Sequence, residues 1–130
     1  MRVVRLAVGP GAAGRALVVA RAFAAAADLG EAAADQLAVV VEECVVNIVE
    51  HGRPASRTRV VVRLSMAAAG CVRLAFSDAG VAFDPRAAAT AEPNLERGGG
   101  AGLALIKAWC EIEAYERRAG RNRLVLRSRS

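Results

Sequence analysis

Apolar and polar residues alternate with a helical period along Val39 to Arg53, VVVEECVVNIVEHGR, and the rest of the chain is organised around this stretch. At about 100° per residue the apolar side chains of this region form one stripe: Leu37, Val40, Val41, Cys44, Val45 and Ile48. Glu43, Asn47 and His51 are four residues apart, so they form a polar row along one edge of that stripe. We therefore predict a helix from about residue 31 to residue 51, ended by Gly52 and Pro54.

The remaining periodicity predicts two further helices and five strands. The helices are expected over residues 12–29, with Gly30 as the C-cap, and over 101–109. Strands are expected over 3–8, 58–66, 71–77, 111–117 and 123–127, and the short link after residue 66 indicates an antiparallel hairpin. Residues 79–100 lack a strand pattern, although 86–91 could hold a helical turn. The predicted fold class is α+β: a two-layer α/β sandwich with a mixed, mostly antiparallel sheet and the helices on one face.

The chain length and the net charge limit the domain organisation and the kinds of partner that we expect. The 130 residues suit a single domain spanning 1–130. The net charge of +5 is compatible with nucleic-acid or acidic-protein partners. No basic run is interleaved with aromatic residues, and the arginines between Arg117 and Arg129 alternate on predicted strands, so we expect a solvated sheet face and no nucleic-acid partner.

The cysteines and the apolar runs indicate the compartment. Cys44, Cys71 and Cys110 are odd in number and widely spaced, which fits neither a disulfide framework nor a zinc site. We expect buried thiols in a reducing cytoplasm. No signal peptide and no apolar run long enough to span a bilayer is apparent, so no membrane association is predicted.

Three stretches are candidates for chemistry. Glu43 and Asn47, one helical turn apart beside a core, are unusual because glutamate is seldom buried without a partner; a solvated helix edge is the plain alternative. Asp78 follows a predicted buried strand, and Gly80 would let a flat ligand approach the backbone, although Asp-x-Gly is also a common turn.

The third stretch is the glycine-rich start of the last predicted helix, from Glu96 to Ile106. Successive N–H groups at a helix start form a cradle for anions such as phosphates. The stretch is not a P-loop, because no Gly-Lys-Ser/Thr follows, and it is not a dinucleotide-binding turn, because no strand runs directly into it. A flexible hinge is the alternative.

Together, and in this order, the three stretches resemble the N, G1 and G2 boxes of the GHKL ATPases, which have the Bergerat (histidine kinase-like ATPase) fold. The closer resemblance is to the small bacterial anti-sigma factor serine-protein kinases of the RsbW type, and it covers nearly the whole chain. The matching residues are Glu43-Asn47-His51-Gly52, Asp78-Gly80-Phe83-Asp84-Pro85 and Gly99-Gly100-Gly102-Leu103, followed by a closing hairpin with Asn122 and Leu124.

The resemblance implies ATP and Mg²⁺ as cofactors and gives roles to these residues. Asn47 would bind Mg²⁺ through its amide oxygen, and Glu43 would act as the general base. Asp78 would accept a hydrogen bond from the adenine amino group, with Gly80 beside the ring. The phosphates would be held at the helix start by Gly99, Gly100, Gly102 and Leu103.

The activity implied is that of an ATP-dependent serine/threonine protein kinase of a partner-switching system. Its substrate would be a STAS-type anti-anti-sigma protein, and it would also bind a sigma factor, as a monomer or a homodimer. The alternative is a non-catalytic ATP-binding module that acts by holding its partner. A histidine kinase fragment is disfavoured, because the one histidine, His51, lies inside the predicted helix of the N box.

Overall fold

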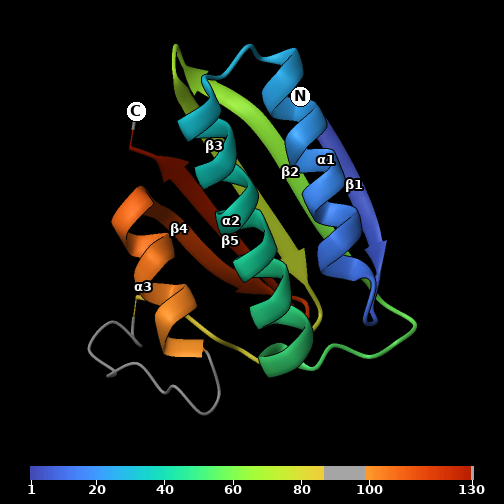
Figure 1. Ribbon diagram of the computed structural model, residues 1–130. Helices are drawn as coiled ribbons and strands as arrows, with labels where there is room; N and C mark the ends of the chain where they lie inside the picture. The colour runs from blue at the N-terminus through green and yellow to red at the C-terminus, as the bar shows by residue number, and fades with distance from the viewer. Residues whose placement is uncertain (87–98, 130) are drawn as a thin grey trace.

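The computed structural model describes residues 1–86 and 99–129. Strands and helices follow one another in an order close to that predicted (Figure 1). The elements are β1 (Arg2–Ala7), α1 (Ala12–Ala26), α2 (Glu31–Asn47), the π-helical turn η1 (Ile48–Gly52), β2 (Arg59–Ala68), β3 (Cys71–Asp78), α3 (Gly99–Trp109), β4 (Cys110–Arg118) and β5 (Arg121–Ser128).

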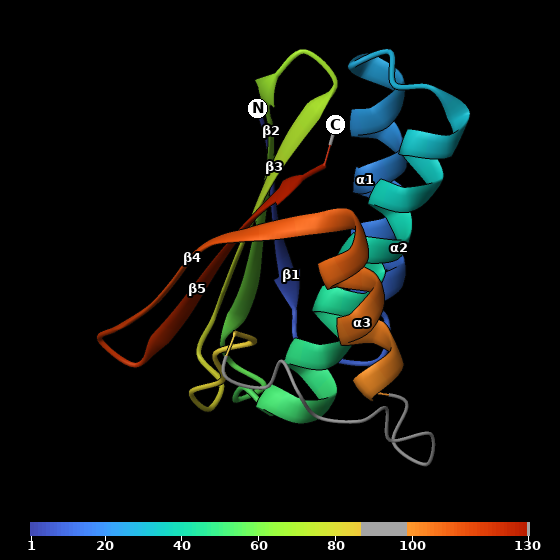
Figure 2. The same ribbon diagram turned by 90° about the vertical axis from the view of Figure 1, so that its left-hand side faces the viewer.

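The five strands form one sheet in the order β1-β2-β3-β5-β4. Every pairing between the described strands is antiparallel. Figure 2 shows α1, α2 and α3 on the same face of this sheet. The predicted α+β sandwich with helices on one face is therefore confirmed, and its sheet is antiparallel throughout the described part.

The core lies between the helices and one face of the sheet. Because strand side chains alternate between faces, Val60, Val62 and Leu64 of β2 all point toward the helices, and each is at most 1% exposed. The predicted apolar stripe of α2 meets them, with Val41 and Val45 fully buried. The whole polar row of α2 therefore stands at the edge of this core.

Two helix ends differ from the prediction. Gly30 is not the C-cap of α1: Asp28 takes the left-handed conformation with φ of 55°, and the Leu29 N–H donates to the Ala24 carbonyl. This is the bonding of a Schellman motif, so α1 ends at Ala26 and Gly30 becomes the N-cap of α2. The end of α2 widens into η1, a kind of turn that is frequent at functional sites.

The part of the predicted helical turn that follows Arg86 lies outside the described residues. Within the described residues, no helix combines the length and apolar character needed to cross a membrane.

Candidate functional site

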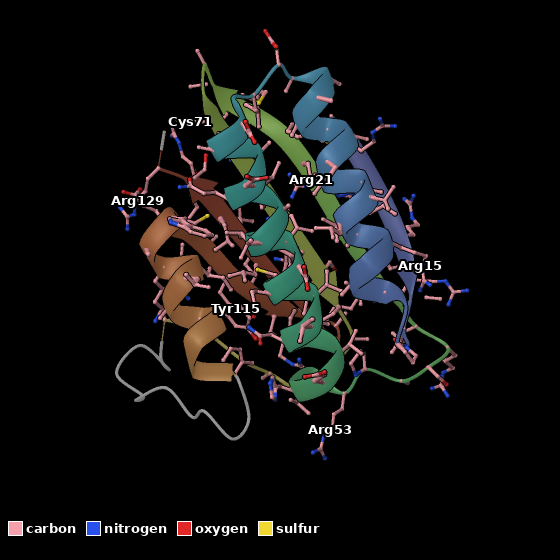
Figure 3. The ribbon with its side chains drawn as sticks, in the orientation of Figure 1. Arg15, Arg21, Arg53, Cys71, Tyr115 and Arg129 are labelled. Carbon is pink, nitrogen blue, oxygen red and sulfur yellow. The ribbon has the colours of Figure 1, made fainter. Side chains whose placement is uncertain are left out.

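The polar row on α2 ends beside the sheet, where β3 also ends. Glu43 and Asn47 are half-buried, one turn apart, and His51 is exposed within η1. The Asn47 side chain makes no hydrogen bond with any other described residue, so its amide oxygen is available to a ligand. Figure 3 shows Arg53, which follows η1, pointing away from the body of the molecule.

Glu43 lies directly against the first turns of α3. A Cβ placed on Gly102 would overlap Glu43 Oε2 and would lie 3.0 Å from the carboxyl carbon. Gly102 is therefore needed at this position to let the carboxylate fit between α2 and α3. Burial, followed by the negative charges of Glu42 and Glu50, raises the pKa of Glu43 above its usual value, which makes it a stronger base than an exposed glutamate.

Asp78 is the last residue of β3 and is only 5% exposed. Its Oδ1 accepts a hydrogen bond of 2.8 Å from the Gly80 N–H and one of 3.2 Å from Asn122 Nδ2. No described donor bonds to Oδ2. A buried carboxylate with one oxygen fixed and the other available can recognise a ligand amine.

Asn122 of β5 connects this carboxylate with the chain that follows it. Its Nδ2 also donates to the Val81 carbonyl at 2.8 Å, and its Oδ1 accepts from the Tyr115 hydroxyl and from Arg117 at 2.9 Å. Tyr115 OH in turn accepts from the Phe83 N–H at 3.2 Å. Figure 3 places Tyr115 on the helix side of the sheet. The network fixes the loop after β3 to the last hairpin.

Sequence reasoning assigned no site role to Tyr115 or Arg117 and placed Asn122 only in the closing hairpin. Arg117 also donates to the Gly80 carbonyl at 2.9 Å. The contacts of Tyr115 and Arg117 with the loop after β3 join residues 32 and 37 positions apart, so local periodicity contains no signal for them. The one available signal was a polar residue, Asn122, at a position where the alternation of β5 requires an inward side chain.

Backbone contacts join the end of α2 to the Asp78 loop. The Val81 N–H donates to the Gly52 carbonyl at 2.9 Å. A Cβ on Gly80 would lie 2.6 Å from that carbonyl oxygen and 2.8 Å from Asp78 Oδ1, so no side chain larger than hydrogen fits. The structure thus brings together all three candidate stretches: Asp78 and Gly80 meet the end of η1, and Gly102 meets Glu43.

The remaining predicted residues lie at the start of α3. Gly99 and Gly100 form its first turn, and Leu103 is half-buried one turn further on. Gly98 lies outside the described residues. The start of α3, where Gly102 lies against the Glu43 carboxylate, is an anion-binding helix end, and Asn47, one turn further along α2, carries an amide oxygen of the kind that suits Mg²⁺. No group of three or more His, Cys, Asp or Glu side chains in the described ranges could hold a metal by itself.

The buried thiols are separate from this chemistry. Cys44, Cys71 and Cys110 are free and buried, as predicted. Burial raises the pKa of Cys44 well above its usual value and that of Cys110 to about 11.

Comparisons with known proteins agree with the fold. Residues 6–128 match the family described as Histidine kinase-like ATPase domain. One chain of the SiaB-SiaC complex from Pseudomonas aeruginosa is 16% identical, with 98% of this chain and 89% of that chain covered and a TM-score of 0.62. The histidine kinase domain of the blue-light activated histidine kinase from Erythrobacter litoralis EL346 is 17% identical, with 91% and 59% covered and a TM-score of 0.54. No curated protein matches the sequence. At these identities the solved structures show a shared fold.

Proposed function

The chain belongs to the histidine kinase-like ATPase domain family, and we propose that within it the chain is an ATP-dependent serine/threonine protein kinase of a bacterial partner-switching system. The matched family implies ATP binding and confirms the resemblance to GHKL ATPases noted in the sequence. The kinase chemistry, the partners and the residue roles are our proposal. A cytoplasmic location fits these roles.

The observation that carries the proposal is the position of Glu43. Its half-buried carboxylate has a raised pKa, lies against Gly102, and stands one turn from Asn47. A general base works best when its pKa approaches the working pH. Glu43 would take the proton from a substrate hydroxyl as that hydroxyl attacks the γ-phosphorus of ATP at the start of α3. The bond from this phosphorus to the β,γ-bridging oxygen would break, and ADP would leave.

The other residues position the nucleotide. Oδ2 of Asp78 would accept a hydrogen bond from the adenine amino group, and Gly80 would leave room for the ring. The backbone around Gly99, Gly100, Gly102 and Leu103 would bind phosphate oxygens. In phosphoryl transfer the protein mainly positions the reacting groups and neutralises charge on the phosphates, and this arrangement supports both roles.

Mg²⁺ would be held by Asn47 together with water and phosphate oxygens. The residues fit this ion, because Asn47 presents a half-buried amide oxygen that is not used by another described residue. The ion would neutralise charge on the phosphates, while the chain itself supplies the base and the adenine contact.

The proposed substrate is a STAS-type anti-anti-sigma protein, and a sigma factor is the proposed second partner. The similar Pseudomonas aeruginosa chain was solved in the SiaB-SiaC complex, which supports a partner-binding role for this chain. A homodimer is compatible with the proposal. We expect no direct contact with nucleic acid or a membrane.

Nucleotide binding is tested by calorimetric titration of the chain with Mg·ATP. Asn47→Ala and Asp78→Asn should each weaken binding by at least about tenfold, since each removes a contact made to a charged or buried group. Glu42→Gln, an exposed change beside the row, is the matched control and should leave affinity unchanged. Wild-type affinity in both test variants would refute the assigned site.

Kinase activity is tested by transfer of labelled phosphate from ATP to the STAS proteins of the same genome. Glu43→Ala should abolish transfer and retain ATP binding. ATP binding without transfer to any STAS protein would overturn the kinase assignment. It would favour the alternative, a non-catalytic ATP-binding module that holds an anti-sigma partner.

A further inference from the structure

The face of the sheet opposite the helices carries most of the strand arginines. Figure 2 shows the three described helices on one side of the sheet, and the other side is bare of them. Side chains alternate along a strand, so the neighbours of each buried residue point to this open face. Its arginines are Arg5, Arg59, Arg63, Arg73, Arg118, Arg121, Arg123 and Arg127.

The charges on the open face are not evenly distributed. The edge strand β4 contributes the glutamates, and two of them pair with strand arginines: Glu113 with Arg73 of β3, across β5, at 2.9 Å, and Glu116 with Arg123 of the neighbouring β5 at 3.8 Å. At the opposite edge of the same face, on β1 and β2, Arg5, Arg59 and Arg63 are exposed. None of the three lies within 4.0 Å of a carboxylate of the described residues. We call these three residues the arginine patch.

The arginine patch surrounds a small apolar centre. In the register of β1 and β2, Arg5 lies opposite Val61, and Arg63 lies opposite Val3. Val3 and Val61 are half-buried, and Ala75, opposite Arg63 on β3, is 9% exposed. Exposed guanidinium groups around an apolar centre are typical of the protein-binding surfaces in which arginine is enriched.

We propose that the arginine patch docks an acidic surface of a protein partner, whose carboxylates pair with Arg5, Arg59 and Arg63 around Val3 and Val61. Arginine favours this use because its planar group can bind a carboxylate through two parallel hydrogen bonds. The patch lies on the side of the sheet away from Glu43 and Asn47. The inference therefore goes beyond the proposed kinase site and does not depend on it.

The charges and the aromatic residues of the strands argue against a nucleic acid or a second copy of this chain as the molecule bound to the open face. A single-stranded nucleic acid requires aromatic side chains for stacking, and Phe76 and Tyr115, the aromatic residues of the strands, point to the helix side. A uniform polyanion laid across the sheet would also meet Glu111, Glu113 and Glu116 on β4. A second copy would oppose arginines to arginines over most of the face, because arginines outnumber glutamates there.

The test begins with a photo-crosslinking amino acid at Ser65, a half-buried residue on β2 at the rim of the arginine patch. The control position is Val18 of α1, on the helix side, which is 69% exposed. Adducts formed in cells that express the chain identify the partner by mass spectrometry. The purified partner is then titrated with the wild type, with R5Q/R63Q, and with R15Q/R21Q, which removes the same charge from α1.

Support requires an adduct specific to position 65, joined to a peptide rich in Asp and Glu. It also requires binding weakened at least about tenfold by R5Q/R63Q and less than about twofold by R15Q/R21Q. Affinity for Mg·ATP should be the same in all three proteins, which separates this test from that of the kinase site. An adduct with nucleic acid or with a second copy, no adduct specific to position 65, or equal effects of the two double variants would overturn the proposal.

Discussion

A buried amide can satisfy several backbone and side-chain groups at once, and Asn122 does so at the end of β3. Its amide nitrogen donates hydrogen bonds to Asp78 and to the carbonyls of Gly80 and Val81. Its amide oxygen accepts hydrogen bonds from Tyr115 and Arg117. In the described part of the chain, Asp78 and Asn122 are the two buried polar residues, each 5% exposed. The orientation of the Asp78 carboxylate therefore depends on a residue 44 positions away.

Replacing Asn122 should damage both stability and the adenine side of the proposed site. Asn122→Ala leaves the Val81 carbonyl and the Tyr115 and Arg117 donors without this partner, so the free energy of unfolding should fall by about 2–3 kcal/mol. Urea denaturation measures this loss. Arg123→Gln, an exposed change at the next position, should cost less than about 0.5 kcal/mol. Equal effects of the two substitutions would contradict a central role for the Asn122 network.

Glu43 is a residue for which stability and function oppose each other. Its folded-state pKa is raised, so the ionised form is disfavoured in the folded chain, and stability decreases as the pH rises from the unfolded pKa through the raised folded pKa. Glu43→Gln should therefore increase stability slightly at pH 7 while it removes the proposed base. Thermal denaturation from pH 4 to 8 measures the difference. A loss of stability at neutral pH in Glu43→Gln would contradict this account.

At the scale of elements, the site depends on how α3 rests on α2. The contact is close because Gly102 has no side chain, and Glu43 occupies the space that a methyl group would need. Since the atoms in the way belong to the end of a flexible side chain, the helix could keep its place while the carboxylate moves. The packing of two helices thus fixes the position of one candidate catalytic group.

Gly102→Ala should therefore separate folding from activity. Alanine is the better helix former by about 1 kcal/mol, which offsets the cost of displacing Glu43, so the melting temperature should change little while phosphate transfer falls strongly. Gly14→Ala in α1, where a Cβ meets nothing within 4 Å, should stabilise the chain and leave transfer intact. Full transfer activity in Gly102→Ala would show that the position of Glu43 is not critical.

At the scale of the whole molecule, the three buried cysteines report on global unfolding. Only the thiolate reacts rapidly with disulfide reagents, and a pKa of about 11 leaves roughly one Cys110 thiol in a thousand ionised at pH 8. Burial adds a steric barrier for all three thiols. Labelling should therefore be slow in buffer and should follow the unfolding curve in urea. Rapid labelling of the folded chain at pH 8 would show that the core opens locally.

Much of the fold was predictable because its signals are local. Alternation in the strands and the apolar stripe of α2 are imposed by burial on one face only, so they can be read from neighbouring residues. The Asp28 cap was missed because the left-handed conformation at a helix end is usually taken by glycine, and Gly30 stood two positions later.

The candidate site was predictable in part for the same reason. Glu43 and Asn47 share one helix, and glycine-rich segments are visible in the sequence. The contact between Gly80 and the Gly52 carbonyl, and the one between Gly102 and Glu43, arise only when separate elements pack. The hydrogen bonds of Asn122 likewise need the full five-strand sheet.

The central position of β3 has a consequence for the order in which backbone amides exchange with solvent. β3 has a hydrogen-bonded strand on each side, and each of those strands has a further neighbour, so its amides should exchange only when the whole domain opens. The edge strands β1 and β4 can fray at lower cost. Asp78 is thus attached to the slowest-exchanging strand, and the adenine side of the proposed site should persist through the partial openings that the domain undergoes.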